Sequence, residues 1–293
     1  MSETVKPRVA FLGTGLMGQP MAERLLAQGY PLRAYNRSRE KAQPLKSSGA
    51  EIVDSPGEAL RQADCVVLML ADAPAIREVI FSEAARRELS SSTVIQMGTI
   101  GPSESQDFER EVNAAGGDYV EAPVLGSIPQ AETGSLIVIV GASREQFEQW
   151  SPLFQCFGPN PYLIGPVGKA AALKLALNQL MVSLTGGFAL SLAMVQHEGL
   201  SVDQFMEILR GSALHAPTFE KKLPQMLSGD YENPNFPTRH LLKDVYLILD
   251  TAQEMGLDAS GLRGMRTVLE KTITRGLADA DYSALFDTIT SES

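Results

Sequence analysis

Three spaced glycines near the N-terminus constrain the fold more than any other feature of the sequence. The pattern Gly13-Thr-Gly-Leu-Met-Gly18 ends a short apolar run, residues 8–13, and opens a helix predicted over residues 17–28. A second apolar run, residues 31–35, follows where a βαβ unit requires its second strand. In such a unit the glycines permit a tight turn and a close approach of the backbone to a pyrophosphate. The sequence therefore predicts a doubly wound α/β domain that binds a dinucleotide.

The end of the second strand predicts which dinucleotide is bound. Enzymes that select NAD usually carry a carboxylate there for the ribose 2′-OH, whereas the 2′-phosphate of NADP needs positive charge and hydrogen-bond donors. This chain has no carboxylate at that point, and it places an arginine between two polar residues. We therefore expect NADPH to be preferred over NADH. The residues predicted to bind the cofactor here are Gly13, Thr14, Gly15, Leu16, Met17, Gly18, Asn36, Arg37 and Ser38.

Short apolar runs and helical stretches continue to alternate up to about residue 165. Strands are predicted at residues 51–53, 64–70, 93–96, 118–121, 135–140 and 162–164, and helices at residues 56–62, 75–87, 104–115 and 146–154. Ligands of open α/β sheets collect outside the carboxyl ends of the strands. We accordingly expect Met69 and Leu70 to contact the cofactor and Thr99 to contact the cofactor or the substrate.

The second part of the chain is predicted to be all-helical. Residues 168–198 form one uninterrupted pattern that is apolar around its whole circumference, and further helices are predicted at residues 201–211, 218–227, 237–256 and 261–276, followed by a short tail. We predict an NADP-binding Rossmann-type domain over residues 1–166 and a helical domain for substrate binding and dimerisation over residues 167–293. Because the long helix is so apolar, we expect a second subunit to cover part of it, in a homodimer or homotetramer.

Composition excludes several classes of function. The formal net charge is −10 and no basic cluster is present, so a nucleic-acid partner is not expected. The two cysteines, Cys65 and Cys156, fit buried thiols in a reducing compartment. With no signal peptide, and no apolar run of membrane-spanning length, we expect a cytoplasmic protein without a membrane partner. No His, Cys and Asp cluster has the spacing of metal ligands, so no metal is predicted.

A lysine and an asparagine interrupt the apolar pattern of the long helix. Lys174 and Asn178 are four residues apart and therefore project from the same face of a helix. In isolation, a solvated lysine is the simpler interpretation of this pair, since an unpaired buried amine is costly.

Several motifs together resemble the β-hydroxyacid dehydrogenase family over nearly the whole chain. They are Gly13 to Ala22, Met97-Gly-Thr99, Ala122-Pro-Val-Leu-Gly-Ser127, Gly165 to Asn178 with its K-x-x-x-N, and Phe236-Pro to Lys243-Asp244. Within the family the chain looks most like the glyoxylate and succinic semialdehyde reductases, whose second strand also ends in Asn-Arg and which use NADPH. The resemblance implies reduction of a small carboxylated aldehyde to the hydroxyacid.

The resemblance also implies a role for each matching residue. Lys174 corresponds to the catalytic lysine, which would give the carbonyl oxygen its proton, and Asn178 to the substrate-binding asparagine. Lys243 would contact the cofactor. The residues expected to bind substrate are Thr99, Leu125, Gly126, Ser127, Lys174, Asn178, Phe236 and Asp244.

Two departures from the family pattern leave alternatives open. Gly98 and Leu125 stand where many members have serines, which removes two hydroxyls that would hydrogen-bond the substrate carboxylate. A 3-hydroxyisobutyrate-type dehydrogenase that oxidises a branched hydroxyacid is therefore an alternative. An imine reductase on the same scaffold is another, although those usually lack this lysine. A third is a non-catalytic NADP-binding regulatory or chromatin-reader module, against which the retention of Lys174 and Asn178 argues.

Overall fold

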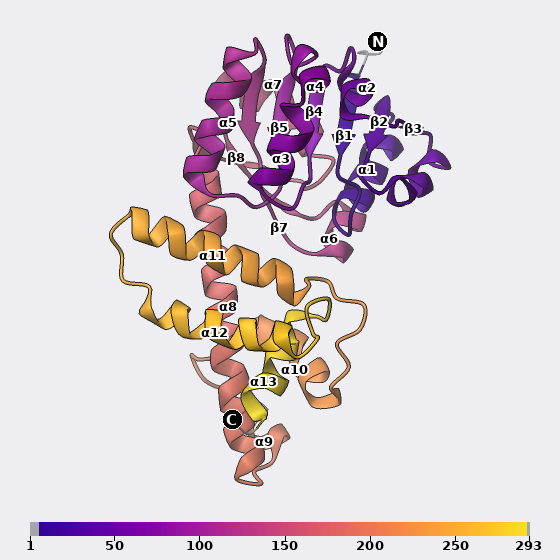
Figure 1. Ribbon diagram of the computed structural model, residues 1–293. Helices are drawn as coiled ribbons and strands as arrows, with labels where there is room; N and C mark the ends of the chain where they lie inside the picture. The colour runs from indigo at the N-terminus through magenta and orange to yellow at the C-terminus, as the bar shows by residue number, and fades with distance from the viewer. Residues whose placement is uncertain (1–5, 292–293) are drawn as a thin grey trace. The chain divides into compact units, whose positions relative to one another are not determined.

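The computed structural model describes residues 6–291 as two compact units. The first unit ends at Lys174 and the second begins at Leu175. This division falls inside one continuous helix, slightly after the boundary at residue 166 that the sequence pattern suggested. Figure 1 identifies the helices and strands along the chain.

The first unit is built on one mixed sheet. Its strands are β1 (Val9–Leu12), β2 (Leu32–Tyr35), β3 (Glu51–Ile52), β4 (Cys65–Leu68), β5 (Thr93–Gln96), β6 (Asp118–Glu121), β7 (Val124–Leu125), β8 (Ile137–Gly141) and β9 (Tyr162–Gly165). Their order is β3-β2-β1-β4-β5-β6-β8-β7, with β9 paired to β8. The six strands from β3 to β6 are parallel, whereas β8 runs antiparallel to β6 and β7. This order confirms the predicted doubly wound sheet, with its switch point between β1 and β4.

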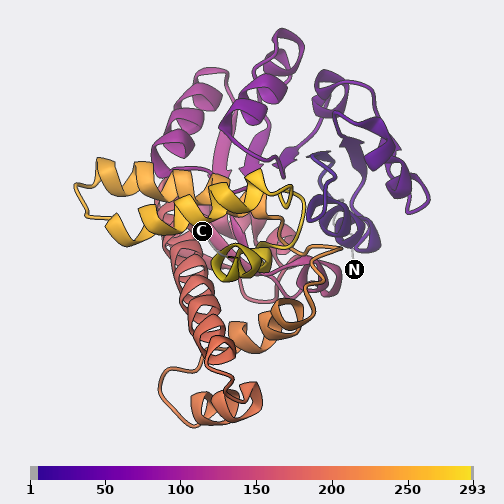
Figure 2. The ribbon, with the colours of Figure 1, turned by 60° about the horizontal axis from the view of Figure 1, so that its bottom comes forward.

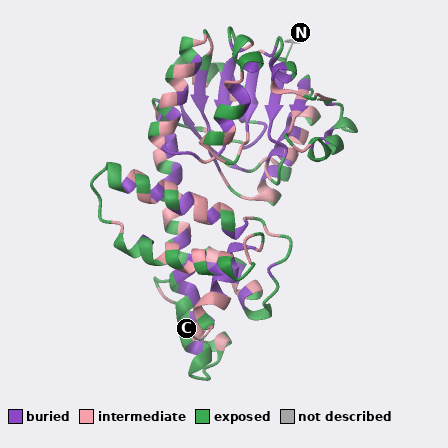
Figure 3. Ribbon diagram, viewed as in Figure 1, coloured by how far each residue is buried: buried purple, intermediate pink, exposed green. Residues whose placement is uncertain are grey.

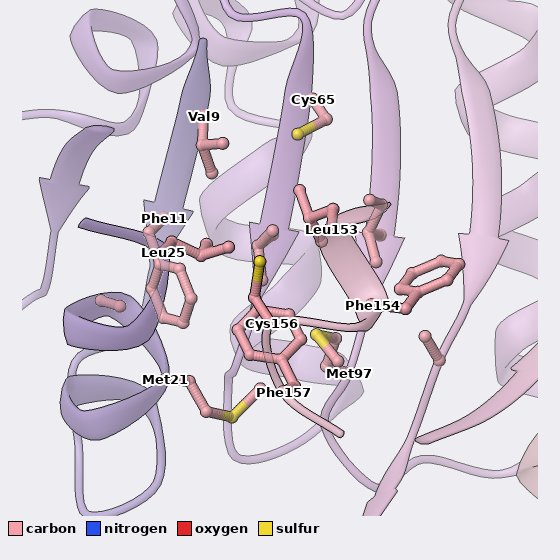
Figure 4. Close-up of a cluster of buried hydrophobic side chains, with 14 of the residues drawn as sticks. Val9, Phe11, Met21, Leu25, Cys65, Met97, Leu153, Phe154, Cys156 and Phe157 are labelled. Carbon is pink, nitrogen blue, oxygen red and sulfur yellow. The ribbon is translucent and has the colours of Figure 1, made fainter. Parts of the chain in front are cut away.

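Every residue of β1, β4 and β5 is buried, which explains the continuous apolar sequences of β1 and β4. Figure 3 shows these central strands in the purple of buried residues. Neighbouring residues of a strand enter separate cores on the two faces of the sheet. Phe11 joins Met21 and Leu25 in one core, which Figure 4 shows in close-up, while Leu12 belongs to the other.

Helices cover both faces of this sheet (Figure 1). They are α1 (Gly18–Ala27), α2 (Pro56–Leu60), α3 (Ala73–Ile80), α4 (Glu83–Arg87), α5 (Pro102–Ala114), α6 (Ile128–Thr133) and α7 (Arg144–Phe154), with 3-10 turns η1 (Arg39–Lys41) and η2 (Gln43–Lys46). The prediction of a single helix over residues 75–87 is wrong. The chain breaks after Phe81, where Ser82 caps the new helix by accepting the N–H of Ala85.

The second unit is helical, as predicted. Its helices are the greater part of α8 (Lys169–His197), then α9 (Val202–Arg210), α10 (Pro217–Ser228), α11 (Thr238–Glu254), α12 (Ser260–Thr274) and α13 (Leu285–Thr290), with the 3-10 turn η3 (Tyr282–Ala284) before the last. Figure 2 shows α8 as a long rod. Buried residues of α8, α11 and α12, among them Val182, Val245 and Leu269, form one hydrophobic core. The short tail expected after residue 276 also contributes to this core, through Tyr282, Leu285 and Phe286.

The length of α8 corrects one expectation. By length and composition alone, this helix of 29 residues could cross a membrane, although no apolar run of that length was expected. Core helices pass the same test, and 44% of its most apolar window is buried in the structure.

Candidate active site

The turn between β1 and α1 is shaped by its three glycines. Gly13 has a φ of +100°, and a Cβ there would lie 2.3 Å from the carbonyl oxygen of Met69. A Cβ on Gly18 would lie 1.9 Å from the carbonyl oxygen of Gly13. Gly15, by contrast, has no atom within 4 Å of the position of a Cβ. The first and third glycines thus allow close packing within the protein, and the second leaves open space beside the backbone, as a dinucleotide phosphate requires.

Asn36 connects this turn to the end of β2. Its side-chain oxygen accepts the backbone N–H of Thr14 at 3.0 Å, and its amide donates to the carbonyl of Ser38 at 2.9 Å. The hydroxyl of Thr14 is buried and has no hydrogen-bond partner among residues 6–291. We expected Asn36 to serve a bound phosphate, but here its carbonyl oxygen and one of its two amide hydrogens hold the loop.

Arg37 and Arg39 lie two residues apart, but only Arg39 forms an ion pair with a carboxylate of the described residues. Arg39 forms an ion pair with Asp54. Arg37 is exposed, and within the described part of the chain no carboxylate lies within ion-pair distance of it. A guanidinium at this position is available to a phosphate group.

Three segments that follow β1, β4 and β5 meet at the carboxyl edge of the sheet. Gly13 lies against Met69 and Leu70, and a Cβ on Gly98 would lie 2.5 Å from the carbonyl oxygen of Leu70. The structure therefore brings together the cofactor-binding residues predicted after β1 and β4, on either side of the switch point. It also explains Gly98, since any side chain there requires the backbone near Leu70 to shift.

A small hollow beside this edge contains the candidate catalytic lysine. Lys174 is only 8% exposed, and it lines the hollow together with Thr99. The other residues of its wall are Gln96, Gly98, Ile100, Ser105, Glu121, Pro123 and Ala171. The buried side chain of Gln96 holds Gly98 from both sides, accepting its N–H at 3.3 Å and donating to its carbonyl at 3.1 Å. Lys174 is thus buried, and the solvated interpretation is wrong.

The segment expected to bind the substrate carboxylate has internal partners in the structure. Leu125 lies in β7 opposite Ile137, and Gly126 has a φ of +138° with no room for a Cβ beside Leu136. The backbone N–H and the hydroxyl of Ser127 both donate to Oε1 of Gln130, at 3.0 and 2.7 Å. Of this segment only Pro123 lines the hollow that contains Lys174.

In the second unit, Asn178 is fixed by a charged neighbour. Its amide nitrogen donates to Oδ2 of Asp244 at 2.6 Å, and both residues are only 2% exposed. The other carboxylate oxygen of Asp244 lies 2.7 Å from Nζ of Lys243. This chain of contacts sets the orientation of the Asn178 amide.

Phe236 precedes α11 and packs between two rings. His240 and Tyr282 meet it edge-on at centroid distances of 6.2 and 6.0 Å. Burial lowers the pKa of His240, and the neighbouring Arg239 and Lys243 lower it further. His240 therefore has a packing role here.

The sequence analysis missed one buried carboxylate in the site. Glu121 ends β6, is 1% exposed and lines the same hollow as Lys174. Burial raises its pKa, while hydrogen bonds from Ser105 and from the start of α8 act in the opposite direction. An acidic residue directly after the apolar pair Tyr119-Val120 was the available signal. Among residues 6–291 no group of three His, Cys, Asp or Glu side chains could hold a metal ion.

Two family profiles match the chain, and together they span most of it. The family described as the NAD binding domain of 6-phosphogluconate dehydrogenase matches residues 8–165. The family described as the NAD-binding of NADP-dependent 3-hydroxyisobutyrate dehydrogenase matches residues 168–289.

Individual proteins resemble the chain along its whole length. Glyoxylate/succinic semialdehyde reductase 1 of Arabidopsis thaliana is 31% identical, over 96% of this chain and 98% of its own. 2-Hydroxy-3-oxopropionate reductase of Escherichia coli is 30% identical, over 95% of each chain. The solved structure of 3-hydroxyisobutyrate dehydrogenase from Mycobacterium tuberculosis has the same fold, with a TM-score of 0.87 at 23% identity, covering 98% of this chain and 100% of that one.

The two profiles and the full-length relatives agree with the glycine turn and the doubly wound sheet. The protein is an oxidoreductase that acts on CH–OH groups with a nicotinamide cofactor, and it belongs to the β-hydroxyacid dehydrogenase family.

Proposed function

We propose that the protein reduces a small carboxylated aldehyde, of the glyoxylate or succinic semialdehyde type, to the hydroxyacid with NADPH. The observation that best supports this is the burial of Lys174, which is only 8% exposed and lines the same small hollow as Thr99. The names of the relatives support the substrate class, since glyoxylate, succinic semialdehyde and 2-hydroxy-3-oxopropionate all combine an aldehyde with a carboxylate.

Backbone groups of the glycine turn are suited to the cofactor's pyrophosphate. Gly15 leaves open space there, and Thr14 offers a buried hydroxyl without a partner among the described residues. Arg37, exposed and without an ion pair in that part of the chain, would pair with the 2′-phosphate and favour NADPH. Met69, Leu70 and Lys243 keep the cofactor contacts expected from their positions in the sequence.

Lys174 is the proposed proton donor. When bound, NADPH supplies the hydride that reduces the carbonyl carbon. The ammonium group of Lys174 gives its proton to the carbonyl oxygen and stabilises negative charge that develops there, work that contributes about 10²–10⁴-fold to a rate. In the oxidation direction the neutral amine would accept the same proton.

Asn178 is the proposed partner of the substrate hydroxyl or carbonyl oxygen. It lies one helical turn beyond Lys174 on α8. Because Asp244 accepts one of its N–H groups, the amide is held in one orientation. Asp244 would thus act through Asn178, which refines the direct substrate contact expected from the sequence.

The substrate carboxylate is proposed to bind at the turn from Leu125 to Ser127. The N–H and hydroxyl of Ser127 converge on a single oxygen of Gln130, so they already form a paired donor site for an oxygen atom. A carboxylate would bind there by displacing the Gln130 side chain. Thr99 and Phe236 keep the substrate contacts that the family resemblance implies.

We also propose that the chain forms a homodimer or homotetramer through α8. Its exposed large apolar side chains in the second unit are Leu180, Leu184, Leu190 and Met194. At 3.6 residues per turn, they fall within an arc of about 120°. Such a stripe is typical of a subunit contact. Sedimentation at micromolar concentration tests this, and a monomer would contradict it.

The function is tested by a substrate panel with both cofactors. Glyoxylate, succinic semialdehyde, methylmalonate semialdehyde and tartronate semialdehyde are each assayed with NADPH and with NADH by the loss of nicotinamide absorbance. We expect turnover of at least one aldehyde, with NADPH preferred. Binding of NADPH without turnover of any member would support the non-catalytic alternative instead.

A second candidate is the oxidation of a branched 3-hydroxyacid. Gly98 and Leu125 make the predicted carboxylate end of the site less polar, and the structure leaves no room for a side chain at residue 98. Adding 3-hydroxyisobutyrate with NADP+ and NAD+ to the panel separates the two functions. If the protein oxidises branched 3-hydroxyacids, this compound should be the best substrate of the panel.

A further inference from the structure

The N-terminal turn of α8 is attached to the sheet by one carboxylate. Oε1 of Glu121 accepts backbone N–H groups from Gly168 and Ala170, each at 2.8 Å, and from Ala171 at 3.2 Å. These amides are among those that a helix start leaves without intrahelical partners. The first turn of α8 has no acidic residue of its own, so Glu121 supplies from β6 the negative charge that a helix N-terminus favours.

The second oxygen of the Glu121 carboxylate also has a hydrogen-bond partner. Its Oε2 accepts the hydroxyl of Ser105 at 2.6 Å, and that hydroxyl also lies 3.0 Å from the phenol of Tyr119. The side chain passes directly over Gly141, where a Cβ would lie only 2.3 Å from Oε1. Four hydrogen bonds and a glycine opposite thus fix this carboxylate in one place.

The attachment point is close to the proposed proton donor. Lys174 lies on α8 one turn beyond Ala170, and its side chain lines the same hollow as Glu121. Rotation or slippage of the first turn of α8 would move Lys174 relative to Thr99, which lines the same hollow. Misplacing a catalytic group by about 1 Å can reduce a rate by about 10²-fold.

We propose that Glu121 is a positioning residue for the reaction: by accepting three N–H groups of the first turn of α8, it fixes the place of Lys174 in the hollow. The inference rests on the proposed role of Lys174. It assigns to Glu121 neither a proton transfer nor a substrate contact.

Two substitutions of Glu121 separate the position of its acceptor oxygen from the charge of its carboxylate. Glu121→Gln keeps an oxygen for the three N–H groups and offers an N–H to the Ser105 oxygen, but it removes the charge. Glu121→Asp keeps the charge but withdraws the carboxylate by one methylene. We expect kcat to fall at least about 10-fold in Glu121→Asp and less than about 3-fold in Glu121→Gln. The reverse order would overturn the proposal, because it would make the charge the active feature.

A double-mutant cycle tests whether Glu121 acts through Lys174. Glu121→Asp is combined with Lys174→Ala, and we expect the added loss in kcat to shrink to less than about 2-fold, since residues that act as a unit are not additive. Equal fold-losses in both backgrounds would contradict positioning through Lys174. If Lys174→Ala alone leaves kcat near normal, the proposed function fails, which is a distinguishable result.

Binding and folding are measured on the same variants. NADPH affinity, from the fluorescence of the bound nucleotide, should remain within about 2-fold, because the glycine turn is untouched. Asp118→Asn is the matched control, since Asp118 is an exposed carboxylate at the other end of the same strand, and it should leave every parameter unchanged. If Glu121→Asp does not fold, Glu121→Gln decides alone: a loss of kcat above 10-fold in a folded protein that binds NADPH overturns the proposal.

Discussion

The two ends of the candidate site are built in different ways. At the proposed cofactor end, the glycine turn offers mainly backbone groups, and the glycines determine how closely these groups approach one another. The groups proposed for the reaction are side chains, and each has a specific partner within its own unit: Asn178 has Asp244, and Ser127 has Gln130. The cofactor end should therefore be damaged by added atoms, whereas the reaction end should be damaged by removed ones.

The largest effect is expected from removing the amine at the reaction end. Lys174→Ala should lower kcat by at least about 10²-fold, because the carbonyl oxygen loses its proton donor. The affinity for NADPH should remain nearly unchanged in a titration. Lys169→Ala, on the exposed first residue of the same helix, is the control and should retain normal turnover. Equal losses in the two variants would remove Lys174 from the mechanism.

Adding one carbon at the cofactor end should produce two different results. Gly13→Ala should destabilise the fold by about 1–3 kcal/mol, because its Cβ would overlap the carbonyl of Met69 and its φ is positive. Gly15→Ala should leave stability within about 0.5 kcal/mol, since nothing in the protein meets the new carbon. Its cost should appear instead as weaker NADPH binding. Thermal unfolding and nucleotide titration of both variants distinguish these outcomes, and equal loss of stability would show that the space beside Gly15 is not open.

Reversing the charge at residue 37 tests the side chain that we propose to pair with the 2′-phosphate of NADPH. Arg37→Glu should weaken NADPH at least about 10-fold more than NADH, because only NADPH carries the 2′-phosphate. The ratio of the two dissociation constants is the measurement. Arg39→Glu is the matched control, since Arg39 already pairs with Asp54. An equal response of NADPH and NADH to Arg37→Glu would show that the 2′-phosphate binds elsewhere.

The smallest effect on kinetics is expected from removing Gln130, whose side chain occupies the proposed binding site of the substrate carboxylate. Gln130→Ala should release the two donors of Ser127 and lower KM for the aldehyde by roughly 3-fold, with little change in kcat, because it changes ground-state and transition-state binding equally. Gln146→Ala is a suitable comparison, because Gln146 holds the equivalent capping position in α7. A raised KM in Gln130→Ala would mean that the glutamine supports the site and does not compete with substrate.

The same contrast explains what the sequence could predict. Strands at residues 93–96 and 118–121 were predicted at the observed bounds from the regular alternation of strands and helices along this part of the chain. The break at Ser82 and the short helix α6 were missed, since local capping decides them against a weak periodic pattern.

The candidate site was predictable in its positions but not in its hydrogen bonds. Asn36 and Ser127 were expected to serve ligands, yet each has an internal partner in the structure. Asn36 bonds to Thr14, which lies 22 residues earlier in the chain, and the partner of Ser127 depends on a helix that was not predicted. Glu121 was missed because its partners lie more than forty residues along the chain, at distances of 47, 49 and 50 residues. Only the fold brings such groups together.

The path of Glu121 over Gly141 has a consequence for engineering this scaffold. Glycine-to-alanine substitution is a common way to stabilise a protein, since it restricts the unfolded chain. At residue 141 the new methyl would occupy the space of the Glu121 carboxylate and push it away from α8. Residues 121 and 141 therefore depend on each other. A designer who replaces β6 or β8 with the strand of a relative has to replace both residues or keep both.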